Sequence, residues 1–193
     1  KATQVLPNGD KYIGTFVNSI MQGPAIVEYV DVARYEGNFK DDLYHGQGKL
    51  EYAEGGSYDG NWKEDYYHGQ GRAEYANGDS YDGNWKEDYY HGQGILIYSN
   101  GDKYEGAFKE DLKHGQGTFT WVATGAIYIG QWKEDLRHGQ GTEISVHGSK
   151  FVGTFFEGWK VKGTYTWTNG NKYVGGFKLD RLSGEGIFTY ALG

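Results

Sequence analysis

The sequence predicts an all-β chain, an elongated single-layer antiparallel sheet of eight tandem β-hairpin repeats of about 23 residues each. The first observation is repetition, because residues 57–71 return almost letter for letter as residues 80–94 and in a looser form as residues 103–117. The second is an aromatic-x-Gly-x-aromatic core that recurs along the whole chain. A fixed period of roughly 20 to 50 residues is typical of repeat architectures.

The repeat cores divide the chain into eight units in register. They are Tyr12-Gly14-Phe16, Tyr35-Gly37-Phe39, Tyr58-Gly60-Trp62, Tyr81-Gly83-Trp85, Tyr104-Gly106-Phe108, Tyr128-Gly130-Trp132, Phe151-Gly153-Phe155 and Tyr173-Gly175-Phe177. The repeats begin near Asp10, Ala33, Gly56, Asp79, Asp102, Ala126, Ser149 and Asn171. One insertion near residues 122–125 and one deletion around residues 159–162 are expected to lie in turns, where the chain tolerates length changes.

Each repeat is predicted to form a hairpin with one aromatic face. Tyr81, Gly83 and Trp85 share one face of a strand, and Asp82 and Asn84 share the other. The hairpins are joined by short turns that contain Asn-Gly pairs, which favour the positive φ angles of a two-residue type I′ turn. These pairs are Asn77-Gly78, Asn100-Gly101 and Asn169-Gly170.

A lone hairpin is marginally stable in water, so the hairpins are expected to pair edge to edge into one sheet. Eight repeats at about 10 Å each would make a rod on the order of 80 Å long. Glycines beside the rings would let aromatic side chains lie across the backbone, and the sheet would curl into an aromatic trough. The trough is either filled by its own side chains or open to an amphipathic partner segment. Its predicted residues are Tyr58, Trp62, Tyr75, Tyr81, Trp85, Tyr98, Tyr104 and Phe108.

Composition limits the location and the chemistry. The net charge is -7, there is no cysteine, and no apolar run reaches the length of a membrane span or a secretory leader. A cytoplasmic location is therefore expected, and disulfides and thiolate metal sites are excluded. The first residue is not methionine and the first repeat starts part-way through, so we expect a fragment of a longer protein.

The recurring polar residues are interpreted as structural. Equivalent histidines in successive repeats would lie about 10 Å apart, too far to share a zinc ion that sits about 2 Å from each ligand. They are expected to be hydrogen-bonded in turns, although a metal held between chains stays open as an alternative. These histidines are His45, His68, His91, His114 and His138.

No candidate for catalysis emerges from the motifs. The His-Gly-Gln-Gly runs lack the helix and the Lys-Ser/Thr pair of a phosphate-binding loop, and are interpreted as turns. The Lys-Glu-Asp carboxylates at residues 63–65, 86–88 and 133–135 are expected in solvated turns with nothing to raise their pKa. Because any catalytic set would be repeated along the array, the chain is predicted to be non-enzymatic and to use no cofactor.

The His-Gly-Gln-Gly runs and the Tyr-x-Gly-x-Trp cores resemble the MORN repeat, named for membrane occupation and recognition nexus. The resemblance covers the whole chain, although residues 22–25 and 158–163 depart from the motif and Ser183 replaces its histidine. It implies an accessory array, as in junctophilins, plant phosphatidylinositol-phosphate kinases, a SET methyltransferase and cytoskeletal proteins of apicomplexan and trypanosome parasites. The protist cytoskeletal type of scaffold is the suggested relative.

Charge is distributed unevenly along the array. Residues 1–141 carry 22 acidic and 13 basic side chains, whereas residues 142–193 carry 4 acidic and 6 basic ones. An acidic surface repels nucleic acid and anionic lipid headgroups. Weak or no lipid binding is therefore expected, with any contact made by Lys150, Lys160, Lys162, Lys172, Lys178 and Arg181.

Two functions are consistent with these features. The favoured one is a scaffold that dimerises and binds protein partners, in a cytoskeletal assembly. The alternative is a phospholipid-recognition module that places a larger protein at a membrane.

The C-terminal repeats are the predicted homodimer interface. Phe156 and Trp159 stand where other repeats have a charged turn, and residues 186–192 carry no charge. The interface is predicted to contain Phe151, Phe155, Phe156, Trp159, Val161, Tyr165, Trp167, Ile187, Phe188 and Tyr190. Two-fold association would cover them. The alternative is that these residues pack inside their own sheet or against further repeats.

Overall fold

A computed structural model of the chain describes residues 1–192, which form seventeen β-strands and no helix. The chain divides into two compact units, Lys1–Ser99 (unit 1) and Asn100–Gly193 (unit 2). Unit 1 contains β1 (Ala2–Val5), β2 (Lys11–Val17), β3 (Ile20–Tyr29), β4 (Ala33–Lys40), β5 (Leu43–Tyr52), β6 (Gly56–Lys63), β7 (Tyr66–Tyr75), β8 (Ser80–Lys86) and β9 (Tyr89–Ile97). Unit 2 contains β10 (Lys103–Lys109), β11 (Leu112–Trp121), β12 (Ala126–Lys133), β13 (Leu136–Ile144), β14 (Lys150–Phe156), β15 (Trp159–Thr166), β16 (Lys172–Lys178) and β17 (Arg181–Thr189).

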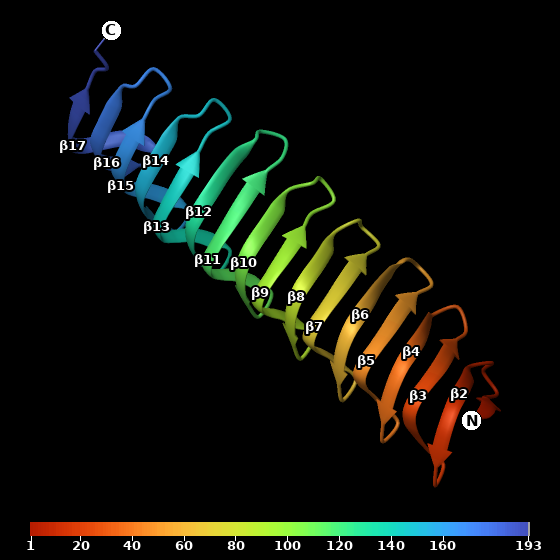
Figure 1. Cartoon of the computed structure of the whole chain (residues 1–193). Coiled ribbons are helices and arrows are strands. Elements are labelled where there is room, and N and C mark those ends of the chain that lie inside the picture. The colour runs from red at the N-terminus through yellow and green to blue at the C-terminus, as the bar shows by residue number, and fades with distance from the viewer. Residues whose placement is uncertain (193) are drawn as a thin grey trace. The chain divides into compact units, whose positions relative to one another are not determined.

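Within each unit, strands that follow one another in the chain are antiparallel neighbours (Figure 1). Each repeat is one hairpin, from β2–β3 for repeat 1 to β16–β17 for repeat 8. No second layer covers the strands among the described residues. The predicted fold class, a single-layer antiparallel sheet of tandem hairpins, is confirmed.

The predicted alternation of faces is confirmed by burial. Tyr58, Gly60 and Trp62 of β6 are buried, whereas Asp59 between them is exposed. The same pattern holds for Tyr81, Gly83 and Trp85 of β8. One face therefore carries the core, which a single sheet can bury only if it bends sharply around its own side chains.

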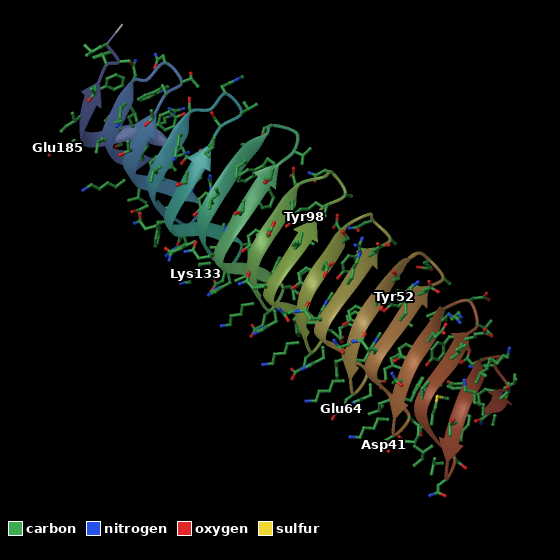
Figure 2. All side chains as sticks on the ribbon, in the orientation of Figure 1. Asp41, Tyr52, Glu64, Tyr98, Lys133 and Glu185 are labelled. Atoms are coloured by element: carbon green, nitrogen blue, oxygen red, sulfur yellow. The ribbon has the colours of Figure 1, made fainter. Side chains whose placement is uncertain are left out.

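The tight two-residue turns connect the two strands within each hairpin. They were predicted at the other end, at the Asn-Gly pairs that join one hairpin to the next. Glu64 and Asp65 both have positive φ, 52° and 69°, between β6 and β7, and Figure 2 shows Glu64 and Asp41 at the same long edge of unit 1. At the predicted site only Gly78 has positive φ, 90°. Gly78 donates to the carbonyl of Tyr75, and the prediction of a type I′ turn at Asn-Gly is wrong.

The side chain of Asn77 explains the difference. Its Oδ1 accepts the backbone N–H of Asp79 at 2.9 Å, an Asx turn that competes with the left-handed conformation at Asn77. The loop is therefore a three-residue connection that needs positive φ only at Gly78. Such loops are the second most common hairpin connections.

Aspartates at five of the tight turns bind the hairpin before them. Asp88 accepts the backbone N–H of Tyr67 at 2.7 Å, and its own N–H donates to the carbonyl of Tyr67 at 3.2 Å. A carboxylate acceptor strengthens such a bond, and two bonds per turn offset the strain of positive φ in a non-glycine residue. These carboxylates were predicted to be solvated. They are exposed, but they also form hydrogen bonds that join neighbouring repeats. The same bond is made by Asp42, Asp65, Asp135 and Asp180.

The His-Gly-Gln-Gly runs lie inside strands, so their interpretation as turns is wrong. Trp62 pairs with Tyr67 and Gly60 pairs with Gly71, which leaves His68, Gly69 and Gln70 opposite Asn61 alone. Gly69 has φ of 64° there. This bulge, with three residues opposite one, bends the second strand of the hairpin, since extra residues on one strand increase local curvature.

The insertion and the deletion fall in different kinds of structure. Residues 122–125 lie between β11 and β12, so the insertion is in a loop as predicted. The deletion is in strand β15, where only Val161 and Lys162 oppose Thr154. The bulge of repeat 7 is one residue shorter than the others, and the turn at residues 157–158 keeps its length.

Candidate functional site

In repeats 2 to 6 and in repeat 8, the hairpin centres on a tyrosine ring that lies across two glycines. In repeat 3 the ring of Tyr58 covers Gly60 and Gly71, and a Cβ on Gly71 would lie 2.5 Å from its Cζ. Its hydroxyl donates to the carbonyl of Asn61 at 2.7 Å. Tyr67 stacks on it with centroids 3.7 Å apart. The expectation that glycines let rings lie across the backbone is confirmed.

The predicted aromatic trough is filled by its own rings. Six of its residues are at most 4% exposed, namely Tyr58, Trp62, Tyr81, Trp85, Tyr104 and Phe108. Tyr75 is 39% exposed and Tyr98 is half-buried. These six rings are therefore core residues, and a partner segment cannot contact them without displacing the core.

Sequence reasoning missed a set of tyrosine pairs on the core face of unit 1. The hydroxyls of Tyr29 and Tyr44 are 2.8 Å apart, and those of Tyr52 and Tyr67 are 2.7 Å apart. The signal was present, because a tyrosine ends the second strand of successive repeats. In Figure 2, Tyr52 and Tyr98 lie toward the edge of unit 1 opposite the tight turns.

Burial of the core tyrosines predicts a loss of stability at high pH. Burial raises the pKa of Tyr128 to about 12, and raises the pKa of Tyr35 and Tyr58 as well. In the unfolded chain these phenols ionise at about pH 10. The stability they contribute is complete below about pH 10 and is lost as the pH rises through the folded pKa. Urea unfolding should show a falling midpoint between about pH 9 and pH 11.5, and a constant midpoint would contradict this assignment.

In unit 2, cations take the place of the stacking tyrosines. Lys113, Arg137 and Lys160 pair with the second aromatic residue of their repeats, as Tyr67 does in repeat 3. The guanidinium of Arg137 lies 5.1 Å from the ring centroid of Phe155, and Lys160 Nζ lies 5.6 Å from that of Phe151. Cations over aromatic faces are attracted by the ring quadrupole.

Arg137 and Lys160 share one carboxylate, that of the half-buried Glu143. Glu143 accepts a hydrogen bond from Arg137 and another from Lys160 at 2.6 Å. Lys160 is 7% exposed, so its prediction as an anionic-lipid contact is wrong, because its charge is used inside the sheet. The other five predicted lipid contacts, Lys150, Lys162, Lys172, Lys178 and Arg181, are exposed.

The predicted dimer residues separate into buried and accessible ones. Phe151 and Phe155 are each 1% exposed and contact Phe177 and Tyr128, so they are core residues and not interface residues. Tyr165 and Trp167 are half-buried, with ring centroids 4.7 Å apart. The accessible residues are Phe156, Trp159, Val161, Ile187, Phe188 and Tyr190.

The residue types that bind metals do not gather in the part of the chain that the structure describes. Among residues 1–192, no three His, Asp or Glu side chains are placed to hold one metal ion. His138 instead contacts the ring of Phe156, with centroids 5.4 Å apart. A metal held between chains stays a hypothesis. None of the described residues belongs to a helix that could cross a membrane.

Comparison with known families identifies the repeat. The family profile of the MORN repeat matches residues 35–57, 58–80, 81–103, 104–123, 128–150, 151–172 and 173–191. The chain belongs to the MORN repeat family. The hairpin β2–β3 lies outside the matched residues but is also antiparallel, with its register shift between Ile13 and Thr15, one residue earlier than in repeat 2. The resemblance inferred from the sequence is therefore confirmed.

Among solved structures, this MORN array has weak similarity to TCP domains. The SAS-4 (dCPAP) TCP domain of Drosophila melanogaster, in complex with a proline-rich motif of Ana2 (dSTIL), is 15% identical, with a TM-score of 0.48 over 81% of this chain and 85% of that chain. The TCP10 domain of Danio rerio CPAP, in complex with a STIL peptide, is 12% identical, with a TM-score of 0.33 over 98% of this chain and 99% of that chain. No curated protein sequence matches the chain.

Proposed function

We propose that this MORN array is a non-catalytic scaffold that self-associates and holds protein partners through an apolar patch on unit 2. The tip patch consists of Leu136, Phe156, Trp159, Val161 and Leu179, which are 43% to 62% exposed. In repeats 2 to 6 the corresponding turns are charged. Large apolar side chains that gather on a water-facing surface are typical of protein interaction sites. This patch is the observation that carries the proposal.

Hydrogen bonds hold the three hairpin ends of the tip patch side by side. The N–H of Gly158 donates to the carbonyl of Arg137 at 2.9 Å, which joins repeats 6 and 7. The N–H of Lys160 donates to Asp180 at 3.0 Å, which joins repeats 7 and 8. The patch is thus preorganised, and preorganisation reduces the entropy lost on binding. A two-fold homodimer is the simplest arrangement in which one such patch covers another.

Light scattering tests the homodimer. The unmodified chain is expected to be dimeric at tens of micromolar, and the double variant Phe156→Glu/Trp159→Glu monomeric, because two carboxylates would be desolvated at the interface. Tyr66→Glu/Tyr89→Glu is the matched control. Both tyrosines are 51% exposed, and each begins its strand in unit 1 as Trp159 does in unit 2. Circular dichroism verifies folding. A monomeric unmodified chain, or a dimer that survives the double variant, contradicts the proposal.

Exposed cations on unit 2 support lipid recognition as a second candidate function. Lys162, Lys178 and Arg181 lie on the same hairpins as Trp159 and Leu179, and basic residues beside aromatic ones favour anionic membranes. Liposomes that contain phosphatidylinositol phosphates should then pellet the chain at low salt. Pelleting that Lys162→Glu/Lys178→Glu abolishes would favour the lipid module over the scaffold. Placement of the scaffold in a cytoplasmic, cytoskeleton-associated assembly rests on family resemblance, and cytoskeletal co-sedimentation tests it.

A further inference from the structure

Repeat 1 departs from the other repeats of unit 1 at two core positions. Ala25 replaces the second of the two glycines that a tyrosine ring crosses, such as Gly48 in repeat 2. Met21 stands opposite Phe16, at the position that Tyr44 occupies opposite Phe39. Both changes alter the space around the tyrosine of the repeat, Tyr12.

The methyl group of Ala25 prevents Tyr12 from packing as its counterparts do. A Cβ on Gly14 would meet Cβ of Ala25 at 2.6 Å, and no atom of Tyr12 is among its nearest neighbours. At the equivalent Gly37, the nearest side chain is Tyr35, whose Cζ would lie at 2.6 Å. Tyr35 is fully buried, whereas Tyr12 is partly exposed. The ring of Tyr12 therefore does not cover Gly14 as the ring of Tyr35 covers Gly37.

A cavity of about 310 Å³ lies at this position in unit 1. Its walls combine aromatic and aliphatic side chains with polar ones, and polar atoms form somewhat more of the accessible lining than apolar atoms do. It is lined by Gln4, Leu6, Tyr12, Phe16, Ser19, Met21, Tyr29, Phe39 and Asp42. The volume is at the lower end of the roughly 300 to 1,000 Å³ of small-molecule sites, so one ring-bearing group fits and a nucleotide does not.

Repeat 2 shows which group such a space accommodates. The ring of Tyr44 stacks on Tyr35 with centroids 3.7 Å apart and makes edge contacts with Phe39 at 5.2 Å and Trp62 at 4.9 Å. Around Met21 the counterparts of these three partners are Tyr12 and Phe16 of repeat 1 and Phe39 of repeat 2, and all three line the cavity. Met21 is narrower and more flexible than a phenol, so it leaves part of this space unfilled.

We propose that this cavity binds one aromatic side chain, tyrosine or phenylalanine, of a protein partner. The inserted ring would occupy the place of the phenol that repeat 1 lacks, with stacking and edge-to-face contacts of the kind that repeats 2 to 4 make internally. Aromatic anchors in preformed pockets dominate many interfaces. The inference rests on the proposed protein-binding function, but none of its residues belongs to the tip patch.

The chain offers a direct reporter, because Met21 is its only methionine. With ¹³C-methyl-labelled methionine, one signal reports on the wall of the cavity. Titration with p-cresol, the tyrosine side-chain analogue, is expected to shift this signal upfield by ring current and to saturate. Cyclohexanol, of similar size but without a ring current or a planar face, is the ligand control and is expected to bind at least fivefold more weakly.

Met21→Tyr should close the cavity with the ring that repeats 2 to 4 carry. Saturation transfer to p-cresol is expected to fall at least fivefold in this variant, with no loss of thermal stability. Leu43→Tyr, which adds the same ring at an exposed position, should leave binding unchanged. Peptides selected for binding to the unmodified chain should share an aromatic residue. The Met21→Tyr variant should not bind these peptides.

Three results would overturn the proposal: no saturable shift of the Met21 signal, equal binding of cyclohexanol, or undiminished binding to Met21→Tyr. A Met21 signal that depends on protein concentration without ligand would make a second copy of the chain the occupant and also overturn it. If only the homodimer proposal is wrong, light scattering will show a monomer while p-cresol still binds to the cavity.

Discussion

Replacing Gly71 with alanine is expected to lower the free energy of unfolding by about 3 kcal/mol or more, because the added methyl displaces a buried ring. The new Cβ would lie 2.5 Å from Cζ of Tyr58, and the Cα of Gly71 faces Gly60 across the strand pair. Tyr58 is fully buried between Trp62, Tyr67 and Trp85, so its ring cannot move aside. Urea unfolding followed by tryptophan fluorescence measures the loss.

A double-mutant cycle tests the cause of this loss. If the clash with the ring is responsible, Gly71→Ala should cost much less in a Tyr58→Leu background, since contacting residues couple strongly. Glu74→Ala on the exposed face is the control and should change stability by about 0.5 kcal/mol or less. Additive losses in the double variant would show that backbone conformation at Gly71 matters and the ring does not.

Replacing Trp85 with alanine is expected to cost about 3 to 5 kcal/mol, as truncation of buried aromatic residues does. Trp85 is 4% exposed, and its indole N–H donates to the carbonyl of Gly71 at 2.9 Å. It makes edge contacts with Tyr58 of repeat 3 and Tyr81 of its own repeat, so its loss opens a cavity between two repeats. Trp62→Ala should behave in the same way, because the indole N–H of Trp62 donates to the carbonyl of Gly48 at 2.8 Å.

Tyr89→Ala is the matched control for both tryptophans. Tyr89 begins the strand after the turn at residues 87–88, on the same hairpin as Trp85, but it is 51% exposed. Its removal should therefore lower the free energy of unfolding by less than about 1 kcal/mol. The comparison is made by urea unfolding of the variants at one pH below 9, where the buried phenols keep their protons. A loss below about 1 kcal/mol for Trp85→Ala would mean that the indole is not part of the core.

The sequence by itself was sufficient for the fold class and the buried face. These properties follow from local periodicity, because a period of two places Tyr81, Gly83 and Trp85 on one side of a strand. The 23-residue period then predicts hairpins that stack in chain order. The position of the glycines beside the rings also predicted that the rings would cross the backbone, as Tyr58 does.

Local patterns were not sufficient where two interactions compete for the same residue. Asn-Gly is a strong signal for a type I′ turn, but Asn77 bonds Asp79 with its side chain and stays out of the left-handed region. Glu64 and Asp65 take that conformation instead, with Asp65 bonded to Tyr44 of the preceding repeat. The partner lies in another hairpin, so no local propensity could have shown which turn would be the tight one.

The tertiary structure alone decided which side chains remain accessible for binding. Strand alternation assigns a face to a residue but not its burial, which depends on how sharply the bulges bend the sheet around the rings. Phe151 and Phe155 are enclosed, whereas Phe156 and Trp159 remain exposed on the same hairpin. Lys160 is buried because Glu143, seventeen residues away, supplies its counter-charge. The cavity in repeat 1 likewise lies where Ala25 and Met21 replace the glycine and the tyrosine of the other repeats of unit 1.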